Sequence, residues 1–315
     1  MQTTHYKQRA TAPAAVLNSS GADRADVVVL LHEYDTFDHS TYFLRDIVDV
    51  WREDGLRVTV LNGPGTRVGA PLAILHVDLT IVPEDYLRFV RNYPAVINGR
   101  VTDISKRAIS ANLVNRDDAF DGPVIVKTDL NCGGVREASL ERRGPFLRKC
   151  LSASRRMLPW GFRSHLRPSA YPVLESKAEV PRAAWNNPKL VVERFLPEAS
   201  DGYFCLRTWV FLGASETHSI CYSKNPVVKS SNVIRREVLG DVPGELRQIR
   251  ANLGFDFGKF DYVIVDGRVV LFDVNRTPTY GGFERERFLP SIRRLAEGIR
   301  GFRERKPGGH LHTAE

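Results

Sequence analysis

The most constraining feature of the sequence is a β-hairpin in its C-terminal third. Two β-rich segments, Phe260 to Val265 and Arg268 to Asn275, are separated only by the dipeptide Asp266-Gly267. This dipeptide favours the tight turns that join antiparallel strands. The sequence therefore predicts two paired strands, and their pairing limits which side chains can meet.

Three oxygen-bearing side chains lie on this hairpin. Asp273 and Asn275 are two residues apart, so on a strand they project from one face, and such ligands suit a hard cation such as Mg²⁺. A regular two-residue loop would pair Asp261 with Phe272 and leave Asp273 on the other face. A metal site therefore requires an odd-length loop or a bulge, for which Gly267 could supply a positive φ. The alternative is that Asp273 and Asn275 are rim residues in turn hydrogen bonds.

The composition is that of a globular enzyme-sized chain. With 315 residues it is too long for one small core, so two or three subdomains are expected. Its apolar runs, such as Val27 to Leu31, fall well short of the roughly 20 residues of a membrane span. The four cysteines match neither a metal knuckle nor a disulfide framework, which favours a cytoplasmic location.

The net charge of +8 is concentrated between Glu141 and Ala170, where eight arginines and lysines accompany one acid. A solvated helical face, a lid over an anionic substrate and a nucleic-acid surface all remain open as interpretations. Residues 1–24 and 304–315 are expected to be disordered tails.

The first hundred residues alternate strand and helix patterns, which predicts an open sheet flanked by helices. No G-x-G-x-x-G follows the first strand, so dinucleotide binding is disfavoured. His32 ends that strand with Glu33 and Asp35 beside it, at the edge where ligands usually bind, and is a candidate for contact with a second substrate. Shorter strand patterns follow, beginning at Val124.

At Asp261, Asp273, Asn275 and Pro278 the sequence resembles the ATP-grasp superfamily. Its magnesium motif is an acid on one strand, then acid-x-Asn on the next, commonly followed by a small residue and proline. Two departures are Asp273, where many members carry Glu, and the bulky Arg276. The resemblance implies an α/β fold with α+β lobes: an N-terminal open sheet domain (25–104) precedes a central lobe with a lid (105–190) and a C-terminal ATP- and Mg-binding lobe (191–303).

Upstream, Gly122-Pro-Val-Ile-Val-Lys127 resembles the strand whose lysine contacts nucleotide phosphates, and Lys106 stands where the family places its first phosphate-binding lysine. Gly133 and Gly134 match a glycine-rich flap. A lysine supplies a point charge, and glycines let backbone N–H groups approach phosphate oxygens. Taken singly, each could equally be a solvated lysine or an ordinary turn.

Leu190 to Pro197 resembles the hinge between the family's two lobes, in which Glu193, Phe195 and Leu196 would read the adenine edge. Because Cys205 stands where some members have Asp, Asp201 is the candidate for ribose. Arg207 and Lys224 match cationic residues that hold phosphate or acyl phosphate in related ligases, and are the expected catalytic residues.

The resemblance implies an ADP-forming ligase that uses ATP with Mg²⁺, or Mn²⁺ in its place, to activate a carboxylate as an acyl phosphate. An amine or similar nucleophile would then capture it, forming a C–N bond. The expected partners are small-molecule carboxylates and amines, with a homodimer left open and no membrane. The alternatives are a kinase on the same fold, a basic nucleic-acid-binding protein, and a nucleotide-binding relic without turnover.

Overall fold

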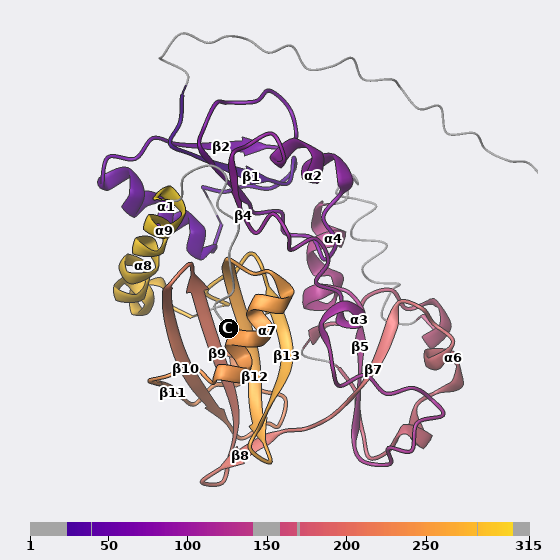
Figure 1. The fold of residues 1–315 in the computed structure, drawn as a ribbon. Helices are drawn as coiled ribbons and strands as arrows, with labels where there is room; N and C mark the ends of the chain where they lie inside the picture. Colours follow the sequence, from indigo (N-terminus) through magenta and orange to yellow (C-terminus); the bar gives the residue numbers. More distant parts are fainter. Residues whose placement is uncertain (1–23, 39, 141–157, 169–170, 282, 305–315) are drawn as a thin grey trace, which may run out of the picture.

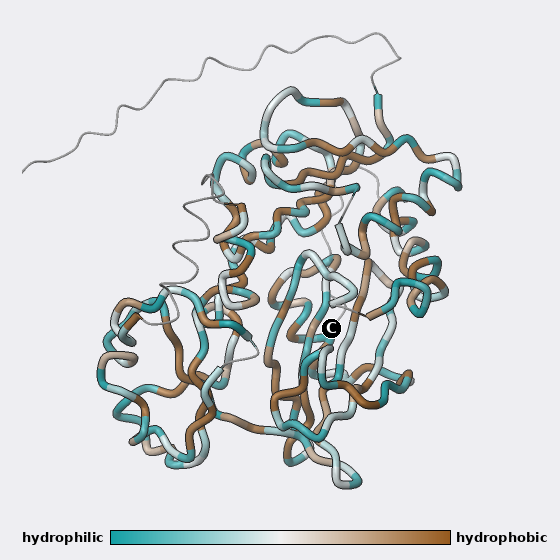
Figure 2. The backbone as a smooth tube through the Cα atoms, turned by 180° about the vertical axis from the view of Figure 1, so that it is seen from behind, coloured by the Kyte–Doolittle hydropathy of each residue, from teal (hydrophilic) through white to brown (hydrophobic). Residues whose placement is uncertain are grey.

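The computed structural model describes residues 24–38, 40–140, 158–168, 171–281 and 283–304 (Figure 1). Apart from Arg24 and Glu304, the expected terminal tails lie outside these residues, as does most of the basic segment that begins at Glu141. Three sheets organise the chain, and Figure 2 shows hydrophobic residues along their strands. Over the described ranges, no helix combines the length and the apolar character needed to cross a lipid bilayer.

The first sheet is parallel, with the strand order β2-β1-β3-β4. Its strands are β1 (Val27–Leu31), β2 (Val58–Asn62), β3 (Leu72–Leu75) and β4 (Ala95–Ile97), and the helices α1 (Phe43–Glu53) and α2 (Glu84–Val90) connect them. Every residue of β1 and β3 is buried, as the continuous apolar runs of a parallel sheet require. The open sheet predicted for this region is confirmed.

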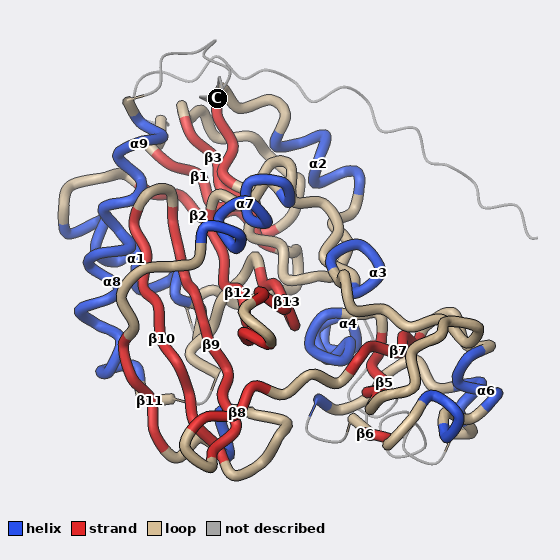
Figure 3. The backbone as a smooth tube through the Cα atoms, turned by 60° about the horizontal axis from the view of Figure 1, so that its bottom comes forward, coloured by secondary structure: helices blue, strands red, loops and turns tan. Residues whose placement is uncertain are grey.

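The second sheet is small and antiparallel, with the order β6-β5-β7. It consists of β5 (Val124–Thr128), β6 (Val173–Leu174) and β7 (Leu190–Arg194). Short helical segments surround it: α3 (Lys106–Ile109), η2 (Asn131–Gly134), α4 (Val135–Leu140), η3 (Trp160–Phe162), η5 (Lys177–Glu179) and α6 (Arg182–Trp185). Figure 3 shows this lobe set apart from the larger sheet, with the chain from β7 running across to β8.

The third sheet is antiparallel, with the order β11-β10-β9-β12-β13, and β8 pairs with β9. Its strands are β8 (Glu198–Ser200), β9 (Tyr203–Leu212), β10 (Ser215–Ser223), β11 (Arg235–Val238), β12 (Phe257–Val265) and β13 (Arg268–Asn275). The helical segments of this part are η6 (Ser230–Asn232), α7 (Gly244–Leu253), η7 (Arg285–Phe288), α8 (Leu289–Ala296), η8 (Glu297–Ile299) and α9 (Arg300–Arg303).

The two faces of this third sheet have different neighbours. One face packs on α7 and buries an aromatic cluster that includes Trp209, Phe211 and Phe260. At one end of the opposite face, Val210 and Leu212 join the core shared by α1 and α8, which lie side by side (Figure 1). The rest of that opposite face is left for the site described below.

The predicted hairpin contains the irregularity that a metal site requires, but not at the glycine. Asp266 and Gly267 both have positive φ, 51° and 75°, and form a regular two-residue turn. The register shifts further along, between Asp261 and Tyr262, so that Asp261 pairs with Asp273 and Phe272 is the extra residue. The expectation that Gly267 would supply the bulge is therefore wrong, because its positive φ is used by the turn.

Arg276, the bulky departure from the family motif, joins the hairpin to the N-terminal sheet. Its side chain is fully buried and donates to the backbone carbonyls of Leu79, Thr80 and Val101. Burial lowers the pKa of Arg276 to about 10, an effect that Asp78 opposes, so the guanidinium stays charged at neutral pH. The large side chain of Arg276 is thus explained by its contacts with the segments around the N-terminal sheet, and it points away from the acids of the hairpin.

Candidate functional site

A cavity of about 410 Å³ opens on the free face of the third sheet. Apolar side chains that line it include Ile125 of β5, Phe195, Leu206 of β9 and Phe272 of β13. Its polar lining includes Lys106, Lys127, Lys229, Lys259, Asp261, Asp273 and Asn275. The cavity therefore joins an apolar wall to a dense group of charges, and the second and third sheets, together with Phe43 of α1, contribute residues to it.

Strand alternation explains how the acids reach this cavity. Thr208 of β9 pairs with Asp261 of β12, which pairs with Asp273 of β13, so all three side chains share one face. The hydroxyl of Thr208 donates to Asp261 Oδ1 at 2.9 Å. The structure thus brings together Asp261, Asp273 and Asn275, the three residues predicted as metal ligands.

Each of the two carboxylates is met by a lysine. The ammonium of Lys106 contacts Asp273, and Lys259 Nζ lies 2.8 Å from Asp261 Oδ2. Burial alone would raise the pKa of Asp273, but Lys106, Lys259 and Lys127 outweigh it and hold that pKa below the usual value. Burial alone would likewise lower the pKa of Lys106, and Asp273 and Glu193 raise it instead. Asp273 and Lys106 are therefore both charged at neutral pH.

Asn275 is positioned by the residue two places after it. Its Oδ1 accepts from the backbone N–H of Thr277 at 2.8 Å, and the Thr277 hydroxyl lies 3.0 Å away. That hydroxyl also donates to Asp78 Oδ1 at 2.6 Å. The amide of Asn275 is thereby connected to the edge of the N-terminal sheet.

Lys127 and Glu193 form a second buried ion pair, 2.6 Å apart, between β5 and β7. Lys127 lines the cavity beside the ring of Phe272, whose centre is 5.4 Å from Nζ. Glu193 is almost fully buried behind the lysine and is not among the lining residues. The structure therefore places Glu193 where it orients Lys127, and it does not bring this carboxylate to the cavity as an adenine reader would require.

The other hinge residues are divided. The ring of Phe195 lines the cavity, while its backbone N–H donates to the carbonyl of Pro123 at 2.8 Å. Leu196 is not among the lining residues, whereas Pro197 is. Phe195 can therefore supply the predicted apolar contact with an adenine ring. Its backbone N–H already donates to Pro123 and is not free to bind the adenine edge.

Gly133 and Gly134 lie beside the cavity without lining it. Both have positive φ, 69° and 75°, and a Cβ on Gly133 would come 2.0 Å from the backbone oxygen of Leu166. These glycines are explained by the close approach of a neighbouring chain segment. The cavity is lined instead by the two residues before them, Asn131 and Cys132.

Three further predicted residues, in addition to Glu193, Leu196 and the two glycines, do not line the cavity. Arg207 projects from the α7 face of the sheet because it alternates with Thr208, and it forks onto Glu198 at 2.7 to 3.0 Å. Asp201 occupies the exposed turn between β8 and β9 with φ of 51°. Lys224 lies over the ring of Tyr203 and donates to the carbonyl of Gly202.

Sequence reasoning missed many of the lining residues, among them Lys229, Arg236, Lys259 and Phe272. Lys259 could have been found, because it stands two places before Asp261 on the same strand and so shares its face. Lys229 follows an irregular loop, where no periodicity indicates direction. Burial lowers its pKa, an effect that Asp273 opposes.

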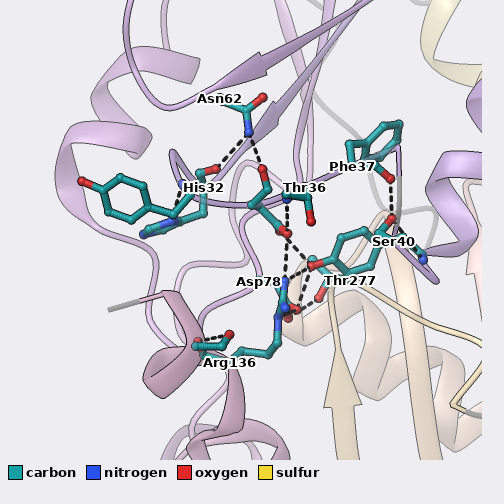
Figure 4. Close-up of polar contacts among 12 residues, drawn as sticks. His32, Thr36, Phe37, Ser40, Asn62, Asp78, Arg136 and Thr277 are labelled. Atoms are coloured by element: carbon teal, nitrogen blue, oxygen red, sulfur yellow. Dashed lines mark hydrogen bonds and ion pairs between the residues drawn. The ribbon is translucent and has the colours of Figure 1, made fainter. Parts of the chain in front are cut away.

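The edge of the N-terminal sheet carries a polar network that Thr277 links to Asn275 (Figure 4). Arg136 of α4 reaches Asp35, at 2.9 Å, and also contacts Asp78. The hydroxyl of Tyr42 lies 2.8 Å from Asp35 and 2.9 Å from Asp78. His32, the candidate for a second substrate, joins this network through its backbone carbonyl, which accepts from Asn62 Nδ2 at 3.3 Å, while its ring stacks on Tyr86 with the centroids 5.9 Å apart (Figure 4).

The fold has a counterpart among solved structures. The ATP-grasp ligase PsnB, in complex with a minimal precursor, superposes with a TM-score of 0.51 at 12% identity, covering 88% of this chain and 98% of that one. This chain has the ATP-grasp fold. Among the structures also found are an ATP-grasp RimK domain protein from Sphaerobacter thermophilus (TM-score 0.44, 12% identity, 87% and 100% covered) and D-alanine–D-alanine ligase from Bacillus anthracis (0.41, 10%, 88% and 99%).

No family model matches the chain, and no curated protein matches it in sequence. The ATP-grasp fold is thus detected through the arrangement of its elements and through the few residues of the hairpin motif. The predicted architecture, an open sheet followed by a two-lobed ATP-grasp unit, agrees with this result.

Proposed function

We propose that the chain is an ATP- and magnesium-dependent ligase that activates a carboxylate as an acyl phosphate and joins it to an amine. The ATP-grasp fold supports the nucleotide assignment. The observation that carries the proposal is the bulge at Phe272, which sets Asp261 opposite Asp273 in a cavity that also contains four lysines.

The donor set fits a magnesium ion. Mg²⁺ is usually held by one or two carboxylates together with substrate phosphates, and Asp261 and Asp273 supply two such groups, with the amide of Asn275 on the same face. When bound, the ion would supply charge neutralisation for the transferred phosphoryl group. Lys106 and Lys259, which neutralise the carboxylates here, would then be free to bind phosphate oxygens.

The lysines would bind the phosphates of a nucleotide, and the apolar wall would contact its purine ring. Phosphoryl transfer depends mainly on positioning and charge stabilisation, for which Lys106, Lys127, Lys229 and Lys259 are placed around the acids. Ile125, Phe195, Leu206 and Phe272 offer the apolar surface that flanks a purine ring. Arg207 and Lys224 have no part in this proposal, because neither lines the cavity.

The reaction would proceed in two steps. A carboxylate oxygen attacks the γ-phosphorus of ATP, the bond from that phosphorus to its bridging oxygen breaks, and ADP leaves. The amine nitrogen then attacks the acyl carbon, phosphate leaves with the former carboxylate oxygen, and the nitrogen loses a proton. The cavity's depth beside the second sheet would shield the acyl phosphate from water.

The test measures Mg-ATP binding by calorimetry and ADP and phosphate release with a panel of amino and hydroxy acids. Asp273→Asn is expected to lower turnover by about 10² to 10³ while the protein still folds. Asp266→Asn is the matched control, because it lies in the exposed turn of the same hairpin, where asparagine also adopts positive φ. ADP release without phosphate would indicate a kinase, and equal activity of both variants would refute the proposed site.

A further inference from the structure

Arg236 of β11 is a cation at the opposite side of the cavity from the acids. It pairs with Cys221 of β10, which shares the cavity face, and both residues line the cavity. Its guanidinium lies 4.9 Å from the ring centre of Phe288. The neighbouring Arg235 points to the other face, over Tyr222, and pairs with Glu237 at 3.2 Å.

Within the described part of the chain, no carboxylate and no hydrogen-bond acceptor pairs with Arg236. The side chain is half-buried, and burial lowers its pKa, with Cys221 the only group that acts in the opposite direction. The ring of Phe288 is the neighbour described for this guanidinium, and a partly desolvated charge without a counter-ion is costly unless an anion arrives to pair with it. Arg236 is therefore suited to bind an anionic group of a ligand.

Arg236 is separated from the acids by the order of the strands. It belongs to β11 at one edge of the sheet, and β10 and β9 lie between this strand and β12, which carries Asp261. An anion held by Arg236 is therefore a different group from the phosphates held by the lysines.

The surroundings of Arg236 indicate what such an anion would be attached to. Val233, Tyr280, Phe283 and Phe288 line this end of the cavity, and the last three are aromatic. Phe288 and Tyr280 pack against each other with their centroids 5.2 Å apart, so this wall is well ordered by its own contacts. An apolar or aromatic body would bury surface here, while its charged end would reach the guanidinium.

We propose that Arg236 and this aromatic wall form a second binding site, for a carboxylate carried on an apolar or aromatic body. We assign this molecule as a substrate of the ligase, which rests on the proposed function. In such a substrate, the carboxylate that Arg236 binds is a different group from the one that reacts near the acids. Binding of the carboxylate itself does not depend on that function.

The test uses 3-phenylpropionate and its neutral isostere 3-phenylpropionamide, each titrated calorimetrically with and without the non-hydrolysable nucleotide Mg-AMP-PNP. Wild-type protein should bind the acid and discriminate against the amide. Arg236→Gln should weaken the acid about 10- to 100-fold, the loss of one charge-assisted hydrogen-bonded pair. Arg235→Gln is the matched control and should leave binding unchanged. Arg236→Lys, which keeps the charge, should retain intermediate affinity.

Equal binding of acid and amide, no binding of either, or equal loss in the Arg235 and Arg236 variants would overturn the site. If Mg-AMP-PNP does not bind while recognition of the acid still depends on Arg236, the proposed function fails and the carboxylate site stands. If the nucleotide binds and Arg236→Gln, folded by its melting curve, binds the acid as wild type does, the carboxylate site fails and the proposed function stands.

Discussion

The two faces of the six-stranded sheet are built from alternate residues of the same strands, yet they differ in almost every property. The face toward α7 carries Trp209, Phe260 and Tyr262 and is closed by packing. The cavity face carries Thr208, Lys259 and Asp261 and is held together by ion pairs. The face toward α7 therefore stabilises the fold, while the cavity face presents charged groups to the cavity. Because side chains alternate along a strand, neighbouring residues belong to opposite faces.

The largest effect is expected on the packed face. Phe260→Ala would leave a cavity among Trp209, Phe211 and Phe255, whose rings surround a fully buried side chain. We expect it to lower the free energy of unfolding by about 3–5 kcal/mol, measured by urea denaturation. A loss below about 1 kcal/mol would show that the α7 face does not hold the sheet together.

The next effect concerns chemistry on the cavity face. Lys106→Met removes the ammonium that contacts Asp273, and turnover should fall by about 10² to 10³. Steady-state ADP release measures it, with the exposed Lys224→Met as control. Should Lys224→Met lose as much activity as Lys106→Met, the division between cavity lysines and surface lysines would be wrong.

Arg207 provides a test with a smaller expected effect. The family resemblance predicts that its side chain acts in catalysis, whereas in the structure this side chain projects from the α7 face of the sheet. Arg207→Met leaves Glu198 without its cation, so we expect a stability loss of about 1–3 kcal/mol. The dissociation constant for Mg-ATP should stay unchanged, because the side chain projects away from the cavity. A large loss of Mg-ATP affinity in a folded variant would show that Arg207 takes part in nucleotide binding.

The smallest effect is a difference in acid sensitivity between the faces. On the packed face burial lowers the pKa of His218, although Gly240 opposes it, so stability from this group declines as pH falls below 6.5. On the cavity face Asp273 has its pKa held below 3.8, so its contribution is complete above that pH and declines only below it.

Unfolding free energies measured from pH 7 to pH 3 separate the two groups. His218→Phe should remove part of the decline that begins below pH 6.5, and Asp273→Asn only part of the decline below pH 3.8. Each group contributes a slope of at most about 1.4 kcal/mol per pH unit. Identical pH profiles for the two variants would contradict the assignment of charge states.

The sequence was sufficient for the hairpin, for the need of a bulge in it and for the two acids that meet across it, because these depend on spacing along the chain. It was not sufficient for Arg207, since the register between β9 and β12 brings together residues more than fifty places apart. Nor could it assign Gly133, because a glycine that admits a neighbouring backbone and one that admits a ligand look alike in sequence. Lys229 and Arg236 belong to a loop and a short edge strand, where direction is decided by tertiary contacts.

Arg276 has a consequence for how the molecule can be divided. The residue that follows Asn275 is fastened by three carbonyls of the N-terminal domain, so the acidic end of the hairpin cannot move independently of that domain. Truncation at residue 104 would remove all three of these acceptors and leave the Arg276 guanidinium without its hydrogen bonds beside the acidic end of the hairpin. The first hundred residues are thus a structural support for the hairpin, and a chain that begins after residue 104 should hold Asn275 less firmly.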